Sequence, residues 1–95
     1  MPTSVRTVVS ILLENKFEIQ YSSYTELAPQ VYGIVILKYK NTFIQIINMM
    51  SGITVLAESD TIPMTTIIER KSYFSRTDLV FILNTLIIRF GYQLN

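Results

Sequence analysis

Residues 31–58 read VYGIVILKYKNTFIQIINMMSGITVLAE and carry the strongest indication of the fold. It holds three segments rich in β-branched and aromatic residues, which are enriched in strands. The segments are Val31–Tyr39, Thr42–Met50 and Ile53–Glu58. Lys40-Asn41 and Ser51-Gly52 separate them, and each pair suits a two-residue hairpin turn because Asn and Gly tolerate a positive φ. The stretch therefore predicts an antiparallel meander.

Two-residue turns also fix the register of these strands. They place Leu37 opposite Ile44, Val35 opposite Ile46 and Gly33 opposite Asn48, and they place Asn48 opposite Val55. Because successive side chains of a strand point to opposite faces, the register sorts the residues into two faces. The core face should carry Val31, Val35, Leu37, Tyr39, Ile44, Ile46, Met50, Ile53, Val55 and Ala57, with Asn48 as its lone interior polar group.

The other face, here called the outer face, is expected to be apolar as well. Its apolar members are Tyr32, Ile34, Ile36, Phe43, Ile47, Met49 and Leu56, and its polar members are Lys38, Lys40, Gln45, Thr54 and Glu58. Antiparallel sheets usually alternate apolar-in and polar-out, and monomers commonly expose apolar patches of only a few hundred Å². Cover could come from the Ser22–Gln30 loop, from residues 59–74 or from a second molecule. We favour a second copy of the chain, most simply in a two-fold dimer.

Helical spacing flanks this meander on both sides. Val5, Val8, Val9, Leu12 and Leu13 form one stripe, which predicts a helix that Thr3 or Ser4 caps and that runs to about Lys16. The period then changes to two over Phe17, Ile19 and Tyr21, the pattern of a strand with one buried face.

The C-terminal third contains one ambiguous segment and one clear helix. Met64–Arg70 is β-branched and favours a strand, although Asp60 and Pro63 could instead start a short helix. Ser75 and Asp78 have the spacing of a capping box, Arg89 suits the last turn, and Gly91 suits a C-terminal cap. The stripe between them is Leu79, Ile82, Leu83, Leu86, Ile87 and Phe90, and Val80, Phe81 and Ile88 widen it.

Together these patterns predict one α+β domain over residues 1–95. An N-terminal helix precedes an antiparallel meander sheet of four or five strands, and a C-terminal helix follows it. Both helices should pack on the Val35/Ile46/Val55 face. The outer face then needs a different cover.

Composition narrows the function classes. Apolar residues make up 49% of the chain and charged residues 16%, against about 25% charged in an ordinary soluble domain. The stretch Leu79–Ile88 is far shorter than the ~20 residues that cross a bilayer, so we expect no membrane span and a cytoplasmic location. Histidine and cysteine are absent, which removes the usual metal clusters and His- or Cys-based nucleophiles. We expect no enzyme, cofactor or metal site.

Basic residues offer a nucleic-acid hypothesis. Lys38 and Lys40 share the outer face with Tyr32 and Phe43, and Arg70, Lys71 and Arg76 precede the last helix. Aromatic and basic residues on a sheet can bind single strands. However, the chain contains eight basic and seven acidic residues. Binding by counterion release needs a clustered excess of positive charge. Lysines that protect a hairpin edge from aggregation are the favoured explanation.

The leading functional prediction is therefore a small non-catalytic interaction module that self-associates and binds or blocks a partner protein. The alternative is a small nucleic-acid-binding or regulatory protein that uses the five basic residues. A small-molecule site between the sheet and the last helix is a third hypothesis.

Overall fold

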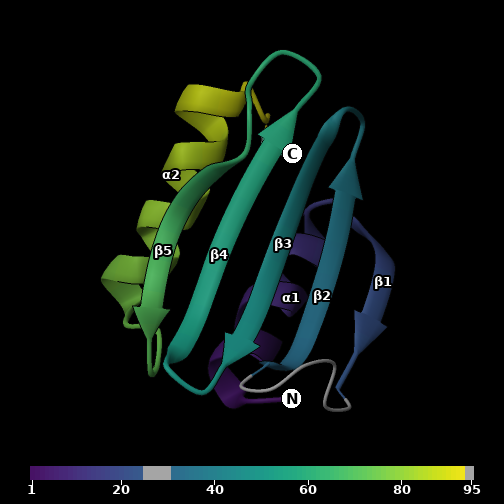
Figure 1. The fold of residues 1–95 in the computed structure, drawn as a ribbon. Coiled ribbons are helices and arrows are strands. Elements are labelled where there is room, and N and C mark those ends of the chain that lie inside the picture. The colour runs from purple at the N-terminus through teal and green to yellow at the C-terminus, as the bar shows by residue number, and fades with distance from the viewer. Residues whose placement is uncertain (25–30, 94–95) are drawn as a thin grey trace.

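The computed structural model describes residues 1–24 and 31–93, which form one five-stranded sheet and two helices (Figure 1). The elements are α1 (Thr3–Glu14), β1 (Glu18–Ser23), β2 (Val31–Tyr39), β3 (Thr42–Met49), β4 (Gly52–Ser59), β5 (Thr65–Lys71) and α2 (Arg76–Phe90). All neighbouring strands are antiparallel, in the order β1-β2-β3-β4-β5. The predicted α+β fold with a meander sheet is confirmed.

Both helices lie on the same side of the sheet, behind it in Figure 1. The core forms in this layer from Val5 and Leu12 of α1, Ile82 and Leu86 of α2, and the core face of the sheet. Val35, Leu37, Ile44, Ile46, Val55 and Ala57 have no exposed surface. Burial of this apolar surface is the main favourable term in folding, and it uses one face of the sheet.

The predicted register of β2 and β3 is confirmed, and that of β3 and β4 is wrong by two residues. Leu37 pairs with Ile44 and Val35 with Ile46, but Asn48 pairs with Ile53 and not with Val55. The turn consists of residues 50 and 51, one position earlier than predicted. A shift of two residues keeps every side chain on its face, so the two-face sorting of β4 survives. Met50 leaves the expected core position and is 66% exposed.

Bulges correct the prediction at the β1–β2 side of the sheet. The register shifts between Val31 and Gly33, so that Val31 pairs with Met49 and joins the outer face. A second shift, between Ile19 and Tyr21, places Tyr21 beside Ile36. A bulge moves the following side chain to the other face, and Ile19 and Tyr21 are both exposed. The expectation of one buried face on this strand is therefore wrong.

The structure also tests the predicted strand over residues 64–70 and the predicted helix caps. β5 confirms the strand over residues 64–70, and the alternative of a short helix is wrong. In α2, Ser75 and Asp78 form the predicted capping box and Gly91 is left-handed. The N-cap of α1 is Pro2, without a side-chain cap. The hydroxyl of Ser4 instead accepts a hydrogen bond from the Phe74 backbone N–H.

Neither α1 nor α2 is long and apolar enough to cross a membrane, as judged over the described part of the chain.

Candidate functional site

The outer face of the sheet is the candidate site, and strand pairing arranges it in rows. One row runs across all five strands through Tyr21, Ile36, Gln45, Leu56 and Thr66. The next row contains Ile34, Ile47 and Thr54. In each row an apolar residue of β2 is followed across the sheet by further apolar or uncharged side chains. The centre of the outer face is therefore free of charge.

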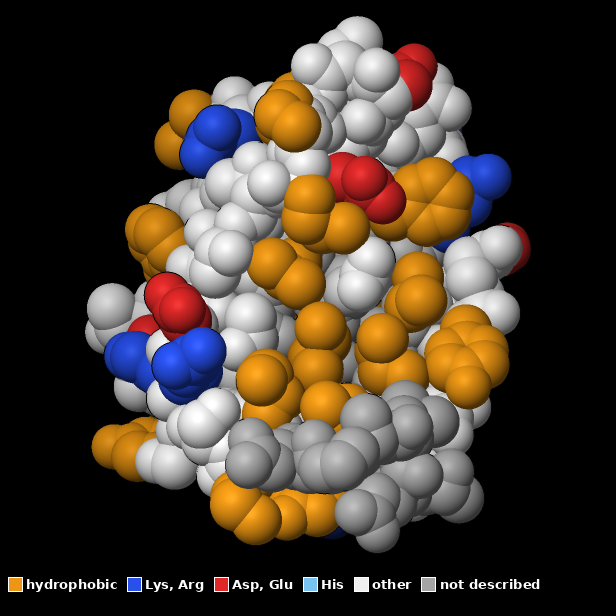
Figure 2. Space-filling model, in the orientation of Figure 1, with side chains coloured by type: hydrophobic (Ala, Val, Ile, Leu, Met, Phe, Trp, Pro, Cys, Tyr) orange, Lys and Arg blue, Asp and Glu red, His pale blue; other side chains and the backbone are white. Residues whose placement is uncertain are grey.

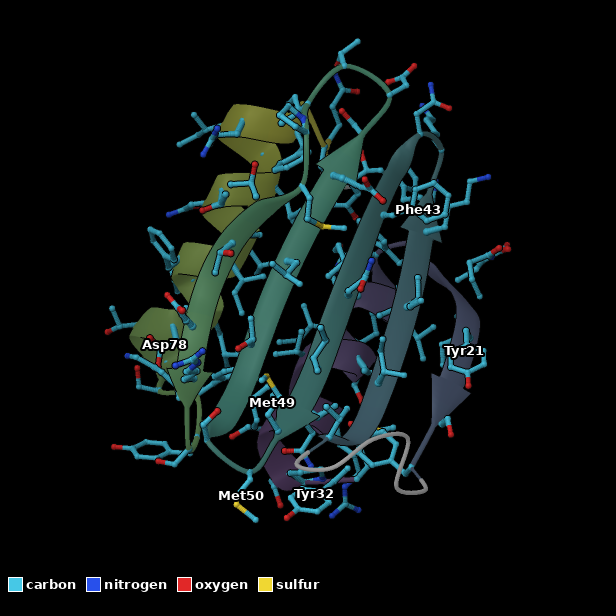
Figure 3. The ribbon with its side chains drawn as sticks, in the orientation of Figure 1. Tyr21, Tyr32, Phe43, Met49, Met50 and Asp78 are labelled. Atoms are coloured by element: carbon cyan, nitrogen blue, oxygen red, sulfur yellow. The ribbon has the colours of Figure 1, made fainter. Side chains whose placement is uncertain are left out.

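Apolar side chains gather in a broad band over this face in Figure 2. Six of the seven predicted residues lie there in a half-buried state: Ile34, Ile36, Phe43, Ile47, Met49 and Leu56. Tyr32 belongs to the bulge and lies at the lower end of the sheet (Figure 3). Val31 and Tyr21 extend the face instead, and alternation alone could not have found them because both depend on bulges.

None of the described helices covers the outer face. Residues 59–74, one of the intrachain covers considered, form β5 and its flanking turns, which extend the sheet at its edge. The second intrachain cover considered is the Ser22–Gln30 loop. Its residues Ser22 and Ser23 are part of β1, and residues 25–30 lie outside the described residues. Tyr24 lies against Gly33, where an added Cβ would come within 2.3 Å of the Tyr24 ring.

One row of the outer face is charged. Lys38 pairs with Phe43, which pairs with Glu58 on its other side. The Lys38 ammonium is 5.2 Å from the centre of the Phe43 ring, close enough for a cation–π interaction. Glu18 pairs with Lys38 at the β1 edge. The row thus places an aromatic ring between a basic and an acidic side chain, at one end of the apolar band.

The five basic residues of the nucleic-acid hypothesis lie in two groups at opposite ends of the sheet. Lys38 and Lys40 border a shallow groove at the end of β2, together with Lys16, which sequence reasoning missed, and Glu18. Arg70 and Lys71 lie at the far end of β5, and Arg76 is the first residue of α2. The strands of Figure 1 separate the two groups diagonally. They do not make one continuous patch.

Lys71 is engaged in the fold. Its ammonium lies 2.8 Å from an Asp78 carboxylate oxygen, and the other oxygen accepts hydrogen bonds from the Ser75 backbone N–H and hydroxyl. The hydrogen bond from Lys71, followed by that from the Ser75 N–H, holds the pKa of Asp78 below its ordinary value. This network ties β5 to the first turn of α2 and has a structural role.

A second apolar surface lies on α2, away from the sheet. Val80 and Phe81 are about half exposed, and Ile88 is 80% exposed. Leu13 on α1 is also exposed. The widened stripe predicted for α2 is therefore only partly buried. Its outward residues are useful as reference positions, because they are apolar and lie on the opposite side of the molecule.

Comparisons of the chain with protein-family models, with curated proteins and with solved structures found no significant match.

Proposed function

We propose that the protein is a small non-catalytic interaction module that self-associates through the outer face and, as a dimer, binds or blocks a partner protein. The observation that carries the proposal is a sheet with both described helices on one face and an apolar band on the other. Leaving such a band in water is unfavourable, and a second copy offers the same band in return. The proposal keeps the cytoplasmic location that the sequence predicts.

The size of the outer face is compatible with a dimer. Five strands about 4.8 Å apart and about seven residues long give roughly 550 Å² in projection. Side chains roughen the surface, so its accessible area is larger than its projection. A standard interface buries about 800 Å² per partner, so the outer face by itself provides an interface at the small end of this size class.

The test places charges at the centre of the apolar band. In an Ile36→Glu/Ile47→Glu variant, each copy would bring two carboxylates to the dimer interface, so that four would be buried there without partners, which is strongly unfavourable. We expect sedimentation velocity to show a dimer for the wild type and a monomer for this variant. Circular dichroism should show an unchanged fold, because both positions border water in the monomer.

Phe81→Glu/Ile88→Glu is the matched control, since it introduces the same two charges on the exposed side of α2. It should leave the dimer intact. A folded Ile36→Glu/Ile47→Glu variant that remains dimeric would move the interface to another surface. A variant that unfolds as a monomer would indicate that the outer face is covered within the chain.

A nucleic-acid-binding role is the second candidate, and the groove bordered by Lys16, Lys38 and Lys40 favours it. Three lysines around this groove would contact the phosphates of a single strand. Binding of a fluorescent single-stranded oligonucleotide at about 50 mM salt should then weaken as salt rises, in the manner of counterion release. It should also weaken in Lys38→Gln/Lys40→Gln. Absence of binding at this salt concentration rejects the second candidate.

A further inference from the structure

Two opposite charges of the outer face lie on either side of its central strand. Lys38 on β2 and Glu58 on β4 flank Phe43 on β3 in a single row. Because neighbouring strands are about 4.8 Å apart, each charged residue starts about one strand spacing from the line of β3. The Lys38 ammonium is 5.2 Å from the centre of the Phe43 ring. The backbone positions of two oppositely charged residues therefore lie at about equal distances from the line of β3.

A two-fold axis parallel to β3, between two packed sheets, makes this arrangement self-complementary. The rotation places β2 of one copy over β4 of the other and sets each row against its own copy. Lys38 of each copy then faces Glu58 of the other, which gives two equivalent pairs. The β3 residues Phe43, Gln45 and Ile47 each meet themselves across the axis. Glu18, two strands from β3, lies outside this central region.

The other two-fold axis in the plane of the interface, perpendicular to the strands, lacks this property. It sets β2 over β2 and reverses the order of the rows. Lys38 would then face the Val31 end of β2, and Glu58 would face the Gly52 end of β4. Both charges would lose water without gaining a counterion, and uncompensated burial of a charge is strongly unfavourable. Charge complementarity thus selects the axis parallel to β3.

We propose that two copies of the chain pack face to face about a two-fold axis parallel to β3, with Lys38 of each copy paired to Glu58 of the other. This rests on the proposed function, whose dimer it specifies. Sheets stacked face to face are about 10 Å apart, and a lysine and a glutamate side chain together bridge that distance. The two pairs fix the direction in which the copies dock, while the apolar band supplies the contact area.

The decisive experiment exchanges the charges. Lys38→Glu sets carboxylates against carboxylates at both pairs, and Glu58→Lys sets ammonium groups against each other. Each variant alone should raise the Kd of the dimer at least about tenfold, because like charges across an interface repel. An equimolar mixture of the two should form heterodimers within about threefold of the wild-type Kd, since both pairs are then complementary. The chain that carries both exchanges should also recover.

Matched controls exclude an effect of net charge. Arg6→Glu and Glu14→Lys make the same charge changes on α1, on the far side of the sheet, and should leave the Kd unchanged. If the wild type dimerises but the single variants keep its affinity, or their mixture gains nothing, the proposed axis is wrong while self-association stands. If the wild type is a monomer, self-association itself fails, and the axis with it.

Crosslinking tests the direction of the axis independently. The chain has no cysteine, so an introduced thiol is the single site of reaction. A Gln45→Cys variant places one thiol near the axis, where a bismaleimide with a spacer of about 10 Å should link two copies. A Thr66→Cys thiol lies two strands from β3, so its copy is about 19 Å away across four strand spacings. Efficient linking at Gln45 and none at Thr66 supports the axis, and the reverse result overturns it.

Discussion

Lys38 and Glu58 lie in one row of the sheet, on either side of Phe43. They are the charged residues of β2 and β4, and both are only partly exposed. In the proposed dimer, Lys38 of each copy pairs with Glu58 of the other, beside the apolar band. The two ion pairs orient the copies, and the apolar contact holds them together. These two contributions respond differently to salt, which makes them separable.

Salt should therefore weaken the dimer only modestly. Raising NaCl from about 50 mM to about 500 mM shortens the screening length, so we expect the two ion pairs to lose strength and the Kd to rise by less than about tenfold. Apolar contacts do not weaken under these conditions. Sedimentation velocity across a salt series measures this, and complete dissociation at 500 mM would show that charge, and not the apolar band, drives association.

Gly52 and Gly91 should differ in their tolerance of alanine. Both have a positive φ, 127° and 70° respectively, but a Cβ at Gly52 would lie 2.5 Å from the Arg70 carbonyl carbon, whereas one at Gly91 meets nothing within 4 Å. Gly91→Ala should lower the free energy of unfolding by about 1 kcal/mol, because alanine is less stable than glycine in this left-handed backbone conformation. Gly52→Ala should cost about 2 kcal/mol or more, because the backbone must also move. Equal losses in urea unfolding would contradict the close approach of β4 and β5.

Tyr24 should contribute through its ring and not through its hydroxyl. The ring packs on Gly33, and the buried hydroxyl has no hydrogen-bond partner among the described residues. Burial also raises the pKa of this hydroxyl. Tyr24→Phe should change the free energy of unfolding by less than about 1 kcal/mol, and Tyr24→Ala should lower it by about 2–4 kcal/mol. A large loss of unfolding free energy in Tyr24→Phe would show that the hydroxyl makes a hydrogen bond.

The Asp78 network should make stability dependent on pH in acid. Because the folded pKa of Asp78 lies below its ordinary value, the carboxylate binds its proton more weakly in the folded state than in the unfolded chain. Its contribution is fully present above the unfolded pKa of about 3.9 and is lost as the pH falls through the folded pKa. Urea unfolding at pH 7, 4 and 3 should show that the wild type has a higher free energy of unfolding than Asp78→Asn at pH 7, and that this difference shrinks as the pH falls.

Lys71→Met tests the cause of that pH dependence, since it removes the ammonium and keeps much of the side-chain length. Lys71 lowers the pKa of Asp78 more than any other group. The loss of stability between pH 7 and pH 3 should therefore be smaller in Lys71→Met than in the wild type. An equal loss in the two proteins would assign the lowered pKa to Ser75 instead.

The strands were predictable from local pattern, whereas the bulges were not. Alternation of apolar residues and a turn at Lys40-Asn41 were enough to pair Val35 with Ile46. The bulge beside Gly33 accompanies contact with Tyr24, a residue from a different part of the chain. The positive φ in the first turn also falls on Lys40 and not on the expected Asn41. Such features depend on tertiary contacts that a local pattern does not contain.

The same reasoning explains what was predicted of the candidate site. Ile34, Ile36 and Ile47 were placed on the outer face by the correct register of β2 and β3. Leu56 was placed there as well because a two-residue error in the register of β4 preserves the face. Tyr21 was missed because it joins the face only through the β1 bulge. Lys16 was missed because the end of α1 approaches the end of β2 only in three dimensions. The centre of the site could thus be predicted from sequence, and its margins could not.

Sedimentation equilibrium of the wild-type chain measures whether two copies associate in solution. A single chain has a mass of 11.0 kDa. Over micromolar to hundred-micromolar concentrations, the account predicts a weight-average mass that rises with concentration to twice this value and then stops, as expected for a closed two-fold dimer. A mass that stays at 11.0 kDa over the whole range would contradict self-association through the outer face.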